Sequence, residues 1–125
     1  MIYRMSMTRK PAFRVYKIDD YGTRRKIASL TGWKCNLIRR KILEKINMRE
    51  FMSARNGIRI YELDEESAVK MALILKTVAL LRNEEKIKVI TSEILKMDRF
   101  EVYWWFSLYL KRGIRAISAL SVAYT

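Results

Sequence analysis

The positions of apolar and polar residues change their period along the chain, from alternation in the first half to a helical spacing in the second. In the first half, the segments "AFRVYKI" (12–18) and "TRRKIASL" (23–30) alternate between apolar and polar residues, and the turn "DDYG" (19–22) lies between them. Gly22 accepts positive φ, so this order of segments predicts a β-hairpin. "IRIYEL" (58–63) alternates in the same way and predicts one further strand.

The other segments of the first half give different patterns. Residues 1–11 end at a proline and predict an irregular arm or a short edge strand. From about 33 to 48, isoleucines recur at every fourth position, which predicts an amphipathic helix. "SARNG" (53–57) predicts a loop.

The second half carries start and stop signals for four helices. Asp64, Asn83 and Asp98 each precede a helical pattern and are good N-cap residues, and glutamates in the first turns favour the same starts. Gly113 ends the third helix, and a short helix follows it. The expected bounds are about 65–82, 84–97, 99–112 and 114–124.

These elements predict an α+β fold, with a small antiparallel β-sheet (a hairpin plus one further strand) and an amphipathic helix in the N-terminal half, packed on a C-terminal bundle of about four helices. The 125 residues contain no long linker, so we expect a single domain, 1–125, with a β-rich half (1–63) and a helical half (64–125). The helices at 65–82 and 99–112 are apolar around most of their circumference, and we expect both at the centre of the bundle.

The run "EVYWWFSLYLKRG" (101–113) concentrates aromatic residues and is either core or a platform for bases. On a helical wheel most of its apolar residues fall on one broad arc, which favours core: Val102, Tyr103, Trp105, Phe106, Tyr109 and Leu110. Trp104 and Leu108 fall on the charged side. They either pack under the last helix or form a protein interface, and we expect the last helix to cover them.

The positive charge is concentrated in the first half. The formal net charge is +13; residues 1–60 hold 16 lysines and arginines against 4 acids, and residues 61–125 hold 10 against 9. Such one-sided basicity is typical of a surface that meets nucleic acid or another polyanion. Basicity without a specific partner is the alternative.

Cationic and tyrosine side chains of the first half form the candidate nucleic-acid-binding set. Cations neutralise phosphates, and tyrosine rings and arginines stack on bases of any kind. The set comes from the three predicted strands and the outer face of the helix near 37–48, where Arg39 lies at the edge of the apolar sector. It comprises Arg14, Tyr16, Arg24, Arg25, Lys26, Arg39, Arg40, Lys41, Lys45, Arg59 and Tyr61.

No catalytic residue is predicted. The chain has no histidine and one cysteine, which excludes Ser-His-Asp and Cys-His sites and makes a zinc site improbable. A carboxylate cluster at a strand-to-helix junction (Glu62, Asp64, Glu65, Glu66), joined by Asp19 and Asp20, is either helix capping or a Mg²⁺ site for nuclease chemistry, and the capping interpretation is favoured. Cys35 is interpreted as a small buried residue rather than a reactive thiol.

The leading hypothesis is a non-catalytic nucleic-acid-binding protein, or a small basic subunit of a nucleoprotein assembly, without cofactor or metal. The alternatives are a helical protein-interaction module, with a protein partner or a homo-oligomer through the helical half, and a small metal-dependent or histidine-free nuclease. We expect a cytoplasmic protein without a membrane span. The lack of histidine and glutamine, with four asparagines among many charged residues, is typical of proteins from hot environments.

Overall fold

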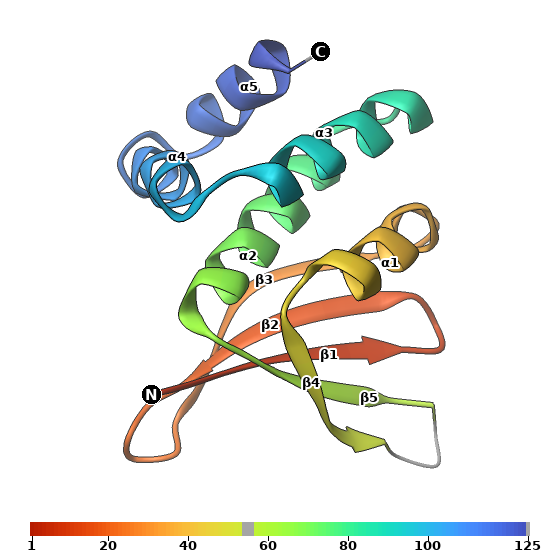
Figure 1. Ribbon diagram of the computed structural model, residues 1–125, viewed down its shortest axis with the longest axis vertical. Helices are drawn as coiled ribbons and strands as arrows, with labels where there is room; N and C mark the ends of the chain where they lie inside the picture. Colours follow the sequence, from red (N-terminus) through yellow and green to blue (C-terminus); the bar gives the residue numbers. More distant parts are fainter. Residues whose placement is uncertain (54–56, 125) are drawn as a thin grey trace.

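A five-stranded antiparallel sheet carries all the described helices on one of its faces (Figure 1). The computed structural model describes residues 1–53 and 57–124. The strands are β1 (Ile2–Thr8), β2 (Ala12–Ile18), β3 (Arg24–Thr31), β4 (Met48–Ser53) and β5 (Arg59–Leu63), in the order β3-β2-β1-β5-β4. The helices are α1 (Lys34–Lys45), α2 (Glu65–Leu80), α3 (Glu84–Lys96), α4 (Arg99–Arg112) and α5 (Ile114–Ala123). The predicted α+β class is confirmed.

The sheet has two more strands than the sequence predicts. The predicted β2–β3 hairpin is confirmed, with Gly22 at a φ of 81° in its turn. β1 lies at the centre of the sheet between β2 and β5, so the expectation of an irregular arm or an edge strand is wrong. Met5 and Met7 face the helices and are buried. β1 is stabilised by hydrogen-bonded pairing with β2 and β5 on both sides rather than by a strong strand propensity of its own residues. β4 was not predicted, and residues 54–56 of the predicted loop lie outside the described residues.

Three of the four C-terminal helices begin at the predicted cap. The side chains of Asp64, Asn83 and Asp98 each accept a hydrogen bond from a backbone N–H three residues further on, at 2.7, 3.0 and 2.8 Å. These bonds satisfy donors that the first helical turn leaves without a partner. Gly113 ends α4 with a φ of 61°, a conformation that favours glycine, and α5 follows at once. None of the described helices is long and apolar enough to cross a membrane.

Helix α2 is the centre of the fold. It packs against β1, β2, β3 and β5 on one side and against α3, α4 and α5 on the other. Its side chains from Met71 to Leu75 are all fully buried, so nearly every direction around the helix faces apolar neighbours. The expectation that the helix at 65–82 lies centrally is confirmed.

Helix α4 is an outer helix, so its expected place at the centre of the bundle is wrong. Val102 is its one fully buried residue, while Tyr103, Trp105, Phe106 and Tyr109 are partly buried against the core. Leu110, which the helical wheel assigned to the core, is 70% exposed. α2 and α5 cover α4 on one side, and the remaining aromatic surface of α4 faces solvent.

Lysines connect one helix to the end of another. Lys34 Nζ donates to the last carbonyls of α2, at 3.3 and 3.0 Å, and Lys70 Nζ donates to those at the end of α3, at 3.3 and 2.9 Å. Helix C-terminal carbonyls lack intrahelical donors and carry partial negative charge, so an ammonium group is well placed there. Some of the basic residues therefore have structural roles.

Cys35 lies inside the core at the start of α1. It is fully buried, and its Sγ lies 3.3 Å from the carbonyl oxygen of Leu30, to which it donates. Burial raises the pKa of the Cys35 thiol, and this outweighs the opposing effects of a backbone hydrogen bond and of Arg39. The thiol is therefore protonated and shielded, in agreement with the interpretation of Cys35 as a small core residue.

The central position of α2 predicts a large difference between two leucine truncations. Leu75→Ala in α2 should lower the free energy of unfolding by about 2–5 kcal/mol, because a fully buried side chain leaves a cavity. Leu110→Ala in α4 removes the same atoms from an exposed position and should change it by no more than about 0.5 kcal/mol. Urea denaturation of both variants measures the difference, and equal losses would contradict the placement of α2 at the centre.

The burial of Cys35 predicts a thiol that reacts only after unfolding. At about pH 8 the native protein should resist alkylation by iodoacetamide, because the raised thiol pKa leaves little thiolate and the core excludes the reagent. In denaturant the same thiol should react at the rate of a free cysteine. Mass spectrometry over a time course measures both, and rapid labelling of the folded protein would contradict the assignment.

Candidate nucleic-acid interface

One face of the sheet is free of helices in the part of the chain that the structure describes (Figure 1). Strand alternation directs Met5, Phe13 and Val15 toward the helices and their neighbours in sequence toward the opposite side, which we call the open face. A shallow hollow crosses the open face. Its lining residues are Arg4, Ser6, Thr8, Arg14, Tyr16, Ile18, Arg24, Ile58 and Ile60.

A row of polar side chains crosses the open face at right angles to the strands. The strand pairing places Lys26 of β3 opposite Tyr16 of β2, Tyr16 opposite Arg4 of β1, Arg4 opposite Glu62 of β5, and Glu62 opposite Arg49 of β4. Directly opposed side chains on one face lie close enough to interact. The row thus brings together residues from five strands that are far apart in the sequence.

Two arginines of the open face lie on aromatic rings. The guanidinium carbon of Arg4 lies 4.2 Å from the centre of the Phe51 ring, and that of Arg24 lies 4.6 Å from the centre of the Tyr16 ring. Such cation–π contacts hold both partners flat against the sheet. Phe51 remains 44% exposed, so part of its ring is available to a ligand.

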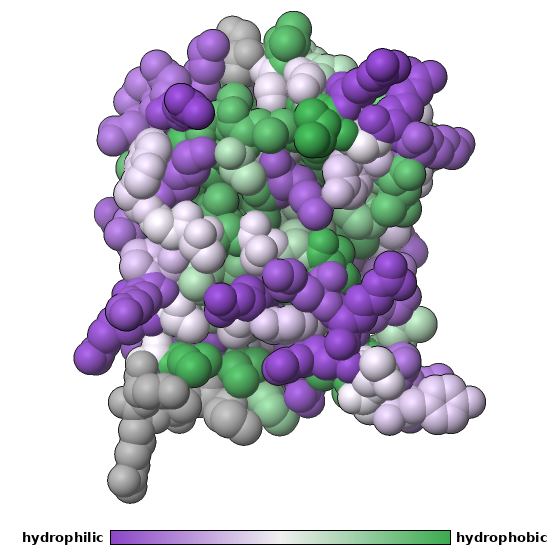
Figure 2. All heavy atoms as spheres, turned by 180° about the vertical axis from the view of Figure 1, so that it is seen from behind, coloured by the Kyte–Doolittle hydropathy of each residue, from purple (hydrophilic) through white to green (hydrophobic). Residues whose placement is uncertain are grey.

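Electrostatics divide the open face into two parts. Within the described strands, Glu62 is the one acid on this face, and it forms ion pairs with Arg4, at 3.9 Å, and with Arg49. The β2–β3 side carries Arg14, Arg24 and Lys26, and no strand acid faces them. In Figure 2, hydrophilic side chains form a band across the sheet half of the molecule and hydrophobic ones follow its lower margin.

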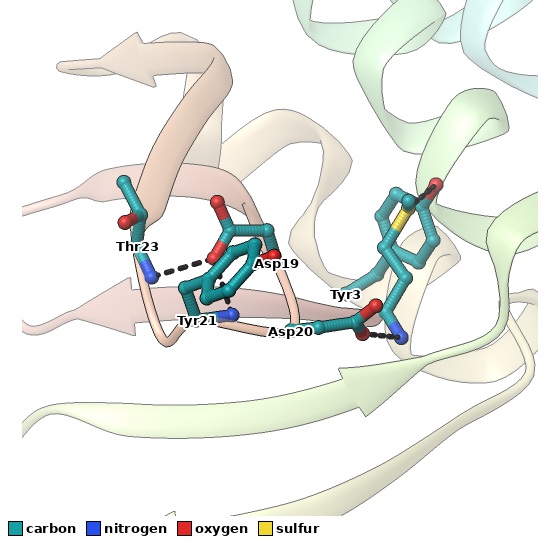
Figure 3. A network of polar contacts seen from close by, with 6 residues as sticks. Tyr3, Asp19, Asp20, Tyr21 and Thr23 are labelled. Carbon is teal, nitrogen blue, oxygen red and sulfur yellow. Dashed lines mark hydrogen bonds and ion pairs between the residues drawn. The ribbon is translucent and has the colours of Figure 1, made fainter.

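The β2–β3 turn is held by Asp19 (Figure 3). Its Oδ1 accepts hydrogen bonds from the backbone N–H groups of Tyr21 and Thr23, both at 2.9 Å. Asp20 pairs with the amino group of Met1 at 3.3 Å. The turn fixes the point at which β3 starts, and therefore the position of Arg24.

The predicted residues of α1 lie on the other side of the sheet from the open face. Arg39 is held inward, with its guanidinium over the Phe13 ring at 5.4 Å and a hydrogen bond to the Thr8 carbonyl at 3.4 Å. Lys41 Nζ binds α3 through the Lys88 carbonyl and the Ser92 hydroxyl, at 3.2 and 2.7 Å. Arg40 and Lys45 are exposed, and Arg40 pairs with Glu44 at 3.1 Å. The structure therefore does not join the α1 cations to those of the strands.

The predicted strand residues separate between the two faces. Arg14, Tyr16, Arg24 and Lys26 lie on the open face by register, although Lys26 also borders a groove on the helix side. Arg25 lines that same groove. Arg59 and Tyr61 share one side of β5, as predicted, and that side faces the helices. The prediction of Tyr61 as an exposed binding residue is wrong, because Tyr61 is buried in the core, while Arg59 is exposed at the end of β5.

The carboxylates of the proposed metal cluster each have a structural contact. Asp64 caps α2, Glu62 pairs with two arginines, and Asp19 and Asp20 hold the turn and the Met1 amino group. Glu65 and Glu66 lie in the first turn of α2, where the helix dipole favours them. Within residues 1–53 and 57–124, no three cysteine or carboxylate side chains gather in a group that could hold a metal ion.

Trp104 and Leu108 differ in their surroundings. Trp104 is 52% exposed and lines a shallow apolar groove of α4 residues with Arg99, Phe100, Tyr103 and Ser107, so the expectation that the last helix covers it is wrong. Leu108 is half-buried and lines a second groove together with Ala116 and Ala119 of α5. The chain runs back along α4, because the hydroxyl of Tyr124, just after α5, lies close enough to the Glu101 carboxylate in the first turn of α4 to donate a hydrogen bond to it. Leu108 lies on the side of α4 that meets α5, and the side that carries Trp104 stays uncovered.

Among the cationic and aromatic residues that the structure places on the open face, the predicted set lacked Arg4, Arg49 and Phe51. Arg4 was missed because β1 was expected to be an arm, although the alternation of Tyr3, Met5 and Met7 with polar residues was a usable signal. Arg49 and Phe51 belong to β4, whose pairing with β5 shifts register between Glu50 and Met52. That irregularity interrupts the alternation by which a strand is recognised.

Comparison with known proteins gives one match. No curated protein and no solved structure matches the chain significantly. Residues 3–123 match the family described as "Domain of unknown function (DUF7680)", so the match covers the sheet with its open face and all the described helices. The chain belongs to this family, DUF7680.

Proposed function

We propose that the protein binds nucleic acid without catalysis, and that it grips the phosphate backbone with the open face of its sheet. The observation that carries the proposal is the arrangement of Arg14, Arg24 and Lys26 on a face that no described helix covers. The concentration of nearly all the net positive charge in residues 1–60 supports it. Cations of this kind neutralise phosphates and release their counterions, which favours binding to any nucleic acid.

The open face is a better candidate than the outer face of α1. Arg39 and Lys41 make internal contacts, and the exposed Arg40 is partly neutralised by Glu44, so α1 offers few free cations. On the open face, arginines lie beside aromatic rings that can also contact bases. The carboxylates give no support to the metal-dependent nuclease alternative, because they cap α2, hold the β2–β3 turn or pair with arginines.

The first test removes two charges from each surface. Arg14→Gln with Arg24→Gln should weaken binding to a generic oligonucleotide by about 25- to 60-fold at about 0.1 M salt, and should lower the slope of log K against log salt by about 1.4–1.8. Arg40→Gln with Lys45→Gln removes the same charge from α1 and should change both quantities much less. Fluorescence anisotropy over a salt series measures them.

Two outcomes of that test would reject the proposal. Equal losses from the two double variants would mean that total charge matters rather than the open face. A wild-type protein that binds no oligonucleotide at low salt would remove nucleic acid as the partner. Thermal denaturation of each variant checks that the fold is retained.

A second candidate function, self-association through α4, is supported by the apolar groove around Trp104. Phe100 is 80% exposed beside it, and contiguous apolar surface of this kind marks contact sites. Both signs of charge lie near this groove. Arg99 lines it, and Glu65 lies close to the Tyr103 hydroxyl. Burial is the largest cause that raises the pKa of Tyr103, and the Glu65 carboxylate is the second. Two copies related by a two-fold axis could therefore place Arg99 of one against Glu65 of the other.

Sedimentation equilibrium tests this second candidate. If α4 forms the contact, the wild-type protein should dimerise, and Phe100→Ser with Trp104→Ser should leave a monomer. Leu110→Ser with Val122→Ser removes apolar side chains that are also exposed but lie elsewhere, and should leave the dimer intact. A wild-type monomer at high concentration would reject it.

A further inference from the structure

We infer that the open face binds single-stranded nucleic acid, with phosphates along β2 and β3 and bases over β1, β5 and β4. This inference rests on the proposed function and adds the class of nucleic acid and its orientation. It follows from the unequal chemistry of the two parts of the open face.

The β2–β3 part suits phosphates. Arg14 of β2 lies opposite Ser29, and Arg24 of β3 lies opposite Ile18. Lys26, opposite Tyr16, lies between these two levels, and no acid of the described strands shares the area. Cations spaced along strands follow an extended, regularly charged chain. The phosphate backbone of the ligand therefore lies parallel to β2 and β3.

The β1–β5–β4 part suits bases better than phosphates. Phe51, Ile58 and Ile60 give it apolar surface, and Glu62 places a carboxylate among them. Arg4 and Arg49 both pair with Glu62, so these three side chains leave a net charge of +1, against +3 for Arg14, Arg24 and Lys26 on the other part, and this region attracts an anion less strongly. A base has no charge, and it stacks on an aromatic ring or on a guanidinium plane.

The two parts of the open face match the arrangement of phosphates and bases in a single strand, and they do not match that of a duplex. In a single strand the phosphates lie along one edge and the bases are free to lie flat on the other side. In a duplex the bases are already stacked inside, and a protein reaches only their edges through the grooves. The open face is a five-stranded sheet, about 19 Å across its strands and therefore wider than the major groove of about 12 Å, so its flat surface does not enter that groove and its rings do not stack on paired bases.

The exposed ring of Phe51 is the central contact in this arrangement. Arg4 lies on the ring at 4.2 Å, and 44% of the residue stays exposed for a base. Tyr16, with Arg24 on its ring, lies between the two parts and provides a second stacking position. The backbone along β2 would bring the bases directly over these two residues.

The test compares three single strands of equal charge and different base content with a duplex. The probes are a thymidine homopolymer of about 15 nucleotides, the uridine homopolymer, an abasic strand of the same length and a duplex. The wild-type protein should bind the two homopolymers at least about fivefold more tightly than the abasic strand, since stacking adds about 5- to 150-fold per base. Their relative affinity distinguishes DNA from RNA as the preferred source of the strand.

A matched pair of variants tests whether the preference for strands that carry bases comes from the Phe51 ring. Phe51→Leu should remove most of the preference for the homopolymers over the abasic strand and leave the salt slope unchanged, because no phosphate contact is lost. Phe100→Leu makes the same change on the exposed surface of α4 and should have no effect. Photo-crosslinking of the wild-type protein to a 5-bromouridine strand gives an independent measurement, and the crosslinked peptide should contain Tyr16 or Phe51.

The results separate the two proposals. Equal binding of the homopolymers, the abasic strand and the duplex would overturn the single-strand inference and leave the proposed function standing. Crosslinks confined to α4 would also overturn it. Failure of the wild-type protein to bind any of the probes would overturn the proposed function itself.

Discussion

The burial of helix α2 is the constraint on which the rest of the structure depends. The helix is apolar around almost its whole circumference, and no single neighbour can cover it. The sheet therefore covers one side of α2, and α3, α4 and α5 cover the other. Because α2 links the two halves in this way, the β-rich half and the helical half share one hydrophobic core.

The same constraint leaves one face of the sheet uncovered. α3, α4 and α5 pack on α2, α1 packs on α3 and β3, and all the described helices lie on one face of the sheet (Figure 1). The strands are therefore largely polar on the other face. Along β1 and β2, methionines, Phe13 and Val15 face the helices, while arginines, serine and Tyr16 face outward. An antiparallel sheet tolerates this arrangement, and the open face is a broad surface that is mainly polar over β1, β2 and β3 and partly apolar near β5 and β4.

The basic residues of the chain serve two different purposes. Lys34, Lys41 and Lys70 bind carbonyl groups of neighbouring helices, and Arg39 lies on a core phenylalanine. On the open face, Arg4 and Arg24 instead lie on aromatic rings, and Arg4 and Arg49 pair with Glu62. A count of charges along the sequence treats all of these alike, and only their contacts separate structural cations from those free to meet a polyanion.

The amino-acid sequence by itself determined the hairpin, the helix starts and the α+β class, because turns and caps depend on residues that are close in sequence. Asp64, Asn83 and Asp98 cap their helices in the expected way, and Gly22 lies in the predicted turn. Alternation alone also selected Arg14, Tyr16 and Arg24 as surface residues of the strands, and all three lie on the open face. The tertiary structure decided the central place of β1, the pairing of β4, the outer position of α4 and the burial of Tyr61. Each of these depends on which element packs against which face, and alternation gives two faces to a strand without saying which one the helices cover.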